Sequence, residues 1–228
     1  MDYAATYPNA NLRFFASDMI LHIDSNAAYL VQDNARSRIA GIYILSSYPS
    51  PAPTIPNPAP NATILVECKT LRSVVASAVE AETGGLFHNG QVAIHLRHLL
   101  QALGHTQPPT PLKTDNSTAN AFVHKALRQK KSKSWDMKNN WLRDRERKQQ
   151  LRVFGEKGKK NAADYFTKHH PAPYHKLMRS KYVLALHNIF HRQKYFSDNV
   201  ARARVCWNVP MVLQSPRTTS TDRRMMTH

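Results

Sequence analysis

Three carboxylates occupy positions where a protein without a cation or acid–base site rarely places them. Glu82 shares one face of a predicted helix with apolar side chains, Asp115 ends a short predicted strand, and Asp164 opens a short predicted helix. A buried carboxylate must be paired, hydrogen-bonded or bound to a cation, because desolvating it alone is costly. Clustered acids without neighbouring bases therefore favour a Mg²⁺ site.

Each of these acids also has a simpler explanation. Glu82 would fit a salt bridge to a Lys or Arg, Asp115 an Asx turn before the next helix, and Asp164 a favourable position at the positive end of its own helix. The pattern alone leaves both explanations open.

Three strands must come before the helix that carries Glu82. Short runs rich in β-branched and aromatic residues predict strands at residues 18–23, 39–47 and 63–70. Residues 48–61 are rich in proline, whose ring removes a backbone donor, so they predict an extended surface loop. Helical spacing then runs from Leu71 to about Leu103 and aligns four residues on one face: Val75, Val79, Glu82 and Leu86. Glu80 lies off this face and is expected to be solvated.

The remaining pattern adds two strands and several helices. We predict a strand at "PLKTD", a helix capped by Ser117 that runs to about Gln129, a helix over residues 135–149, a strand at "LRVF" and a short helix from about Asn161. This order predicts a mixed α/β sheet with helices on its faces.

The composition favours a polyanionic partner. The 228 residues suit one domain with tails, and 32 Lys+Arg against 15 Asp+Glu give a net charge of +17. Such an excess is typical of proteins that bind nucleic acid, although an ordinary basic protein is the alternative. The two cysteines, Cys68 and Cys206, have no metal-ligand spacing and predict packing roles in a reducing compartment. No signal segment and no long apolar run is present, so we expect a soluble intracellular protein, cytoplasmic or nuclear, without a membrane partner.

Basic residues concentrate between residues 125 and 160, which hold 14 Lys+Arg and 4 Asp+Glu. This density favours contacts to a phosphate backbone, whereas a solvated charged helix face is the alternative. Trp135 and Trp141 within the stretch are expected to be core residues. The candidate nucleic-acid-binding residues are Lys130, Lys131, Lys133, Lys138, Arg143, Lys157, Lys159 and Lys160.

Several ordered motifs resemble one family. "LHIDSNAAYL", "ARSRIAG", "VEAETGGLFHN", "PTPLKTDNSTA", "SWDMKNNWLRDR" and "NAADYFTKHH" resemble the ribonuclease H domain of copia-type retrotransposon polyproteins, over roughly residues 1–175. "MDYAATYPNA" resembles the end of the reverse transcriptase that precedes this domain. The resemblance divides the chain into a reverse-transcriptase remnant (1–16), a ribonuclease H-like domain (17–170) and a basic, partly disordered extension (171–228).

The resemblance implies a ribonuclease H-like mixed five-stranded sheet flanked by helices, within a larger polyprotein. Its acids are an Asp, Glu, Asp, Asp set, of which Glu82, Asp115 and Asp164 match the last three. Two Mg²⁺ ions, with Mn²⁺ as an alternative, would serve endonucleolytic hydrolysis of the RNA strand of RNA/DNA hybrids.

Asn26 stands where the family places its first aspartate. Asp24 and Asn26 point to the same face of a strand, about 6.6 Å apart at about 3.3 Å per residue, so Asp24 replaces the missing ligand only through a bulge or register shift. An amide offers one neutral oxygen, and we expect severely reduced metal binding and turnover. The candidate catalytic residues are Asp24, Asn26, Glu82, Asp115 and Asp164, and the candidate metal ligands are the four acids among them.

Two other functions remain open. A basic nucleic-acid-binding remnant of the same fold would keep the surface and lose catalysis. An integrase or transposase of the same fold fits less well, because here the glutamate comes second in the acid set and not last.

Overall fold

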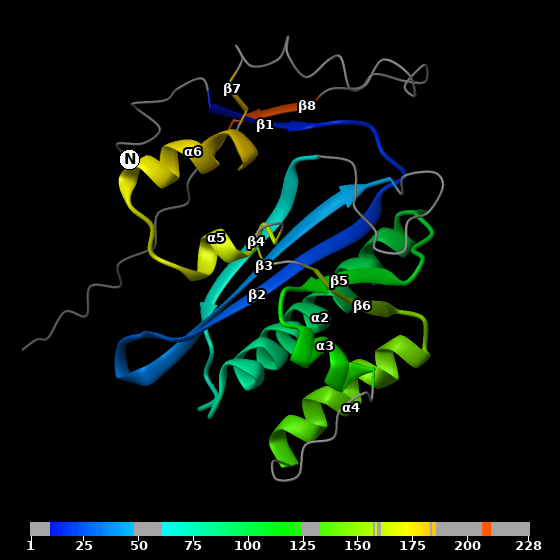
Figure 1. Ribbon diagram of the computed structural model, residues 1–228. Coiled ribbons are helices and arrows are strands. Elements are labelled where there is room, and N and C mark those ends of the chain that lie inside the picture. The colour runs from blue at the N-terminus through cyan, green and yellow to red at the C-terminus, as the bar shows by residue number, and fades with distance from the viewer. Residues whose placement is uncertain are drawn as a thin grey trace, which may run out of the picture.

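A computed structural model of the chain describes residues 10–47, 61–124, 133–156, 158, 161–182, 184–185 and 207–210. Its centre is a five-stranded sheet in the order β4-β3-β2-β5-β6 (Figure 1). β2 pairs antiparallel with β3 and β3 with β4, whereas β2, β5 and β6 are parallel. The strands are β2 (Ile20–Gln32), β3 (Arg36–Ser46), β4 (Thr63–Thr70), β5 (Thr110–Thr114) and β6 (Leu151–Gly155). The predicted mixed five-stranded sheet flanked by helices is confirmed.

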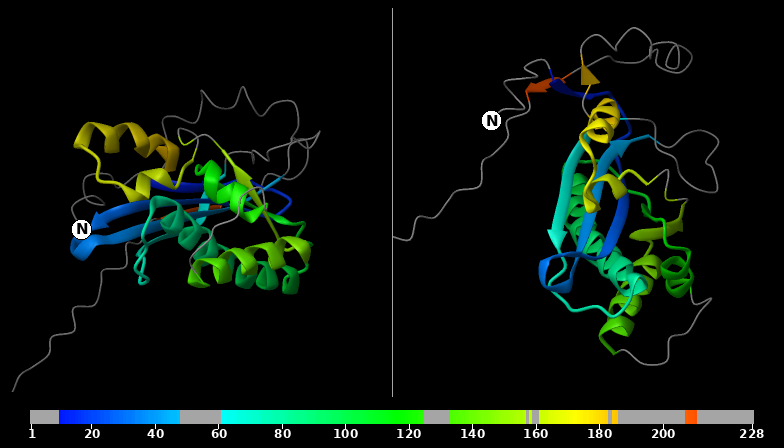
Figure 2. Two further views of the ribbon diagram at one scale, coloured as in Figure 1. Left: turned by 60° about the horizontal axis from the view of Figure 1, so that its bottom comes forward. Right: turned by 60° about the vertical axis from the view of Figure 1, so that its left-hand side comes forward.

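Helices lie on both faces of this sheet (Figure 2). One face is covered by α2 (Ala78–Ala102), α3 (Ser117–Val123) and α4 (Lys133–Arg147), and the opposite face carries α5 (Asp164–Thr167) and, beyond it, α6 (Ala172–Tyr182). Strand alternation explains the two layers. Ile23 and Tyr43 pack with Leu86 of α2 in the main core, whereas Ile42 packs with Ala163 next to α5.

The first sheet strand is much longer than the predicted segment 18–23. β2 runs on to Gln32 because its polar middle stays paired with β3, with Asp24 opposite Ile42 and Asn26 opposite Ala40. These polar residues gave no strand signal in the sequence. The strand therefore carries both candidate residues of the first position through the centre of the sheet.

The long helix begins at Ala78 and not at Leu71, so Val75 lies outside it. Ser77 caps this end, since its Oγ accepts from the backbone N–H of Glu80 at 3.2 Å. Glu80 is half-buried and accepts from the N–H of Ala76 at 2.7 Å, which corrects its predicted solvation. Glu82 and Leu86 are buried as their shared face predicted.

Two further predictions change and one is confirmed. Asn116, and not Ser117, caps α3, because its Oδ1 accepts from the N–H of Ala119 at 2.9 Å. Cys68 is exposed and is therefore not a packing residue. Trp135 is buried and Trp141 packs half-buried against the main core, which confirms both as core residues.

Both ends of the chain contribute strands that the sequence did not predict. β1 (Ala10–Phe14) pairs antiparallel with β7 (Leu184–Ala185) and β8 (Trp207–Pro210) in a separate three-stranded sheet. The α6 helix was not predicted either. Most of the proline-rich stretch and most of the chain after residue 185 lie outside the described residues. No helix in the described ranges has the length and apolar content needed to cross a membrane.

A buried asparagine joins α2 to the two central strands. Asn89 Nδ2 donates to Ser25 Oγ at 2.8 Å and to the backbone oxygen of Ala40 at 2.9 Å. The Tyr43 hydroxyl donates to Asn89 Oδ1 at 3.0 Å. Gly41 leaves the space for this amide, since a Cβ there would lie 2.8 Å from Asn89 Cγ.

We expect Gly41→Ala to destabilise the fold by about 1–3 kcal/mol, because the added methyl group overpacks Asn89 and disturbs its three hydrogen bonds. The measurement is the free energy of unfolding in urea. Gly85→Ala is the matched control: its nearest neighbours would lie at 3.5 Å, and alanine favours a helix. An equal loss in both variants would contradict the role given to Asn89.

Candidate active site

Asn26 joins the central strand β2 to the short helix α5 through hydrogen bonds. It is 2% exposed, and its Nδ2 donates to Thr167 Oγ1 at 2.7 Å and to Asp164 Oδ1 at 3.1 Å. The two partners lie 138 and 141 positions further along the chain. The residue in place of the expected first aspartate is thus in direct contact with the last candidate acid.

Glu82 is held between β2 and β5. Its Oε1 accepts from the N–H of Ala27 at 2.9 Å and its Oε2 from the Thr114 hydroxyl at 3.3 Å. Burial raises the pKa of Glu82 to about 8, and the charges of Asp115 and Asp164 add to this against the two hydrogen bonds. The helix therefore presents this carboxyl at a fixed place beside the other acids.

Asp115 and Asp164 complete a cluster of three interacting acids with Glu82. Both are half-buried, and the pKa of Asp115 is raised by burial and then by the charge of Asp164. Lys168, one helical turn after Asp164, forms an ion pair with it. The hydrogen bond to Asp164, followed by the charges of all three acids, raises the pKa of Lys168. We call Glu82, Asp115 and Asp164 the acid cluster, and Lys168 is a cation attached to it.

Asp24 belongs to a different set of contacts. It is buried opposite Lys113 of β5, whose Nζ lies 3.3 Å from Asp24 Oδ1 and 3.3 Å from Glu156 Oε2. The backbone N–H of Ala162 donates to Asp24 Oδ2 at 3.3 Å. Burial raises the pKa of Asp24, and the positive charge of Lys113 opposes this. Asp24 thus has a charged partner of its own, and its role as a metal ligand stays a prediction.

The acid cluster has the donor type that a divalent cation prefers, but its carboxyl groups do not lie close enough together to hold one. Its side chains offer hard oxygen atoms, and a bound cation would relieve the repulsion that, second to burial, raises the pKa of Glu82 and Asp115. Its first position departs from this pattern, because Asn26 directs an amide N–H at Asp164. Within the described part of the chain, no three His, Cys, Asp or Glu side chains come close enough together to hold one metal ion.

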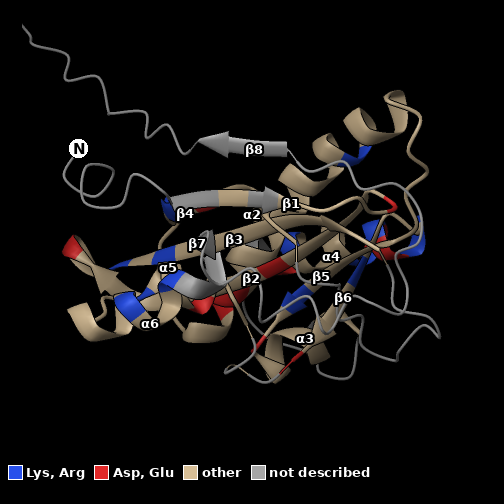
Figure 3. Ribbon diagram, turned by 90° about the horizontal axis from the view of Figure 1, so that it is seen from above, with Lys and Arg blue, Asp and Glu red and all other residues tan. Residues whose placement is uncertain are grey.

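The described basic residues of α4 make contacts within the protein. Arg143 donates to the backbone oxygen of Val123 at 3.1 Å, and Lys138 donates to Ser73 Oγ at 3.3 Å. Basic and acidic segments are mixed on this helix (Figure 3). Lys133 begins α4, but its side chain lies outside the description, as do five whole residues: Lys130, Lys131, Lys157, Lys159 and Lys160.

Sequence reasoning missed three residues of this region: Lys113, Thr167 and Lys168. Spacing offered a signal for two of them. Lys168 follows Asp164 by four positions, the separation at which side chains meet on a helix, and Lys113 precedes Asp115 by two, on the same face of the strand. Thr167 carried no signal, because its partner Asn26 is remote in the chain.

We expect the free energy of unfolding to fall less with rising pH in Glu82→Gln than in wild type. The folded-state pKa of Glu82, about 8 against an ordinary 4.5, means that the folded chain keeps a proton that the unfolded chain has released. Stability therefore falls between these two pH values as the carboxyl is forced to ionise. The measurement is the free energy of unfolding in urea at about pH 5 and about pH 9. Glu80→Gln, on the same helix, is the control, and the same pH dependence in wild type and Glu82→Gln would contradict the assignment.

Three solved structures illustrate what the chain resembles in three dimensions. No family model and no curated protein matches it. It is similar to the N-terminal RNase H domain of Rv2228c from Mycobacterium tuberculosis, solved as a fusion with maltose-binding protein, at 12% identity and a TM-score of 0.42, over 65% of this chain and 91% of that one. It is similar to LC11-RNase H1 in complex with an RNA/DNA hybrid at 12% identity and a TM-score of 0.43, over 64% of this chain and 91% of that one. It is also similar to the protease–reverse transcriptase of prototype foamy virus at 12% identity and a TM-score of 0.38, over 70% of this chain and 21% of that one.

Proposed function

We propose that this chain is a ribonuclease H-like domain of a copia-type retroelement reverse transcriptase. Its ancestral reaction is Mg²⁺-dependent endonucleolytic hydrolysis of the RNA strand of RNA/DNA hybrids, and Asn26 impairs it. One observation carries the proposal: position 26 contacts Asp164, which interacts electrostatically with Glu82 and Asp115. These are the four positions that the sequence resemblance aligns with the family's acids.

Glu82, Asp115 and Asp164 are the residues that would hold Mg²⁺, with Mn²⁺ as an alternative, and their carboxyl groups would have to move closer together than they lie in this structure. When bound, such ions supply the Lewis acidity that activates a water molecule and stabilises the leaving 3′ oxygen of the RNA. The chain itself fixes the carboxyl of Glu82 through Ala27 and Thr114. Asn26 adds no negative charge, so the site attracts divalent cations less strongly than a four-acid site.

A nucleic-acid-binding remnant without catalysis is the second candidate. It is favoured by the state of Asp164, which already pairs with the ammonium group of Lys168 and accepts from the amide of Asn26. These contacts compete with a metal ion for the same carboxylate. The two candidates differ in whether the natural chain cleaves a hybrid that it binds.

Asn26→Asp is expected to raise Mg²⁺-dependent cleavage of a labelled RNA/DNA hybrid by on the order of 100-fold, because it restores the fourth carboxylate. The measurement is single-turnover cleavage by wild type and variant side by side. Asn26→Asp combined with Asp115→Asn is the control and should lose the gain.

Activity of wild type equal to that of Asn26→Asp would contradict an impairment at position 26. If Asp24→Ala then abolished that activity, Asp24 would be the ligand that replaces the missing acid. Activity in neither protein, with hybrid binding intact, would favour the binding remnant.

We expect hybrid affinity to fall steeply with salt, by about 10³-fold between 50 and 200 mM for about six phosphate contacts, because binding releases counterions. Fluorescence anisotropy across a salt series measures this. Lys138→Gln should lower the slope of log affinity against log salt by about one. Lys69→Gln is the control, since Lys69 pairs with Glu67 outside the basic stretch. Affinity that does not change with salt would contradict phosphate binding.

A further inference from the structure

Four rings form a compact group where α5 is followed by α6. Tyr165 stacks on His170 with ring centroids 5.2 Å apart and planes 5° from parallel. The ring centroids of His170 and Tyr174 are 4.4 Å apart, with an angle of 32° between the planes. His175 meets the edge of Tyr165, with centroids 5.6 Å apart at 78°. We call these four residues the ring cluster. The Tyr165 and Tyr174 centroids are 6.2 Å apart with planes at 36°, so the first three rings form a triangle in which each ring contacts the other two.

Hydrogen bonds hold the rings of the ring cluster in place. The Tyr165 hydroxyl and His175 Nδ1 lie 2.6 Å apart, and His170 Nε2 lies 3.2 Å from the backbone oxygen of Tyr165. The backbone N–H of Tyr174 donates to the oxygen of Pro171 at 2.9 Å, which starts α6 with this ring in place. The rings are therefore held in one arrangement before any ligand arrives.

The ring cluster is not needed to fill the hydrophobic core. Tyr165, His170 and Tyr174 are half-buried and His175 is exposed, and neither core cluster of the described residues includes any of them. Phe166, by contrast, packs against Ile42 and Ala163 beneath α5. Four partly exposed rings gathered in this way form a surface suited to stacking.

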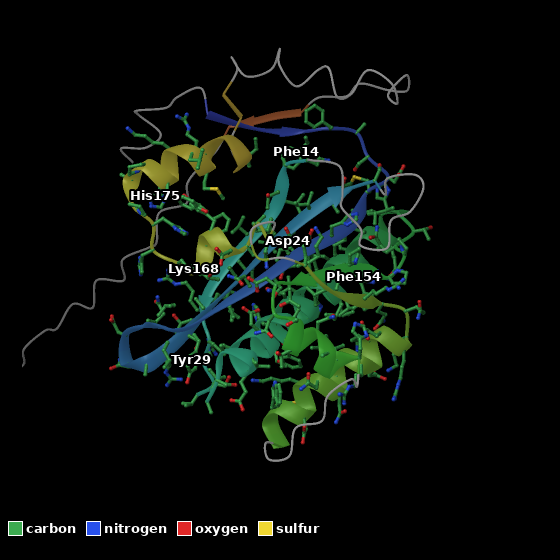
Figure 4. The ribbon with its side chains drawn as sticks, in the orientation of Figure 1. Phe14, Asp24, Tyr29, Phe154, Lys168 and His175 are labelled. Atoms are coloured by element: carbon green, nitrogen blue, oxygen red, sulfur yellow. The ribbon has the colours of Figure 1, made fainter. Side chains whose placement is uncertain are left out.

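The segment that carries the ring cluster has basic residues and no acidic ones. Residues 165–182 contain no Asp or Glu and four basic residues: Lys168, Lys176, Arg179 and Lys181. Tyr165 directly follows Asp164 of the acid cluster, and Lys168 and His175 lie on the same side of the molecule (Figure 4). Aromatic rings beside positive charge are the combination with which proteins bind single-stranded nucleic acid.

We propose that the ring cluster binds unpaired bases of a single strand that extends from a hybrid at the acid cluster, with the first base stacked on Tyr174. The ligand is single-stranded because bases within a duplex have no free faces. Stacking accepts any base, so this contact recognises an unpaired strand and not a sequence. The inference rests on the proposed function for the location of the hybrid.

The experiment compares three labelled hybrids of one sequence: blunt, with a short thymine extension, and with an abasic extension of equal length. Anisotropy at one salt concentration gives the Kd of each for the full chain. We expect the thymine extension to tighten binding about tenfold over the abasic one, which carries the same phosphates. Tyr174→Leu should remove this gain and leave the Kd of the blunt hybrid unchanged.

Tyr174→Phe keeps the ring and should retain the gain, and Tyr29→Leu, a half-buried tyrosine on β2, is the control for losing a ring elsewhere. Thermal unfolding of each variant separates misfolding from lost stacking. Equal Kd values for thymine and abasic extensions would overturn the inference and leave the ring cluster as a brace between α5 and α6. If the blunt hybrid does not bind at all, the proposed function fails, and thymine and abasic single strands alone then test the ring cluster.

Discussion

The middle of the central strand β2 buries three consecutive polar residues, and groups from several other elements form hydrogen bonds or ion pairs with them. Asp24 meets Lys113 and the backbone of Ala162, Ser25 meets Asn89 of α2, and Asn26 meets Asp164 and Thr167. A buried polar group without a partner costs on the order of 1–3 kcal/mol. The helices on the two faces must therefore supply partners at fixed heights along β2, which sets the position of α2 and α5 against the sheet.

The same constraint creates the electrostatics of the site. Glu82 reaches the end of β5 because its carboxyl accepts from the backbone beside Asn26, and this brings it into the field of Asp115 and Asp164. Three carboxyl groups are thereby gathered on one side of Asn26. On the other side, Asp24 is balanced by Lys113, which also faces Glu156. The sheet thus separates a strand-bound ion pair from an acid cluster in which burial and neighbouring acids raise the pKa of Glu82 to about 8.

Local patterns predicted the sheet well and its polar contacts poorly. β4 matches its predicted segment, because alternating side chains and flanking turns define a strand without reference to the rest of the chain. The length of β2 could not be predicted, since "DSNAA" forms a strand only through its pairing with β3. Glu82 could be found from helical spacing, and Asn26 as a departure from the family motif. The contacts of Thr167 with Asn26 and of Lys113 with Asp24 join distant segments, which one sequence does not display, although spacing had placed Lys113 on the strand face of Asp115.

The amide at position 26 has a consequence for how the domain holds together. With a carboxylate at position 26, two like charges would face each other across β2 and α5 and would oppose this contact unless a proton or a cation lay between them. Asn26 instead donates to both Asp164 and Thr167. Hydrogen bonds of the polypeptide alone consequently hold α5 against β2, so this contact does not depend on a bound ion.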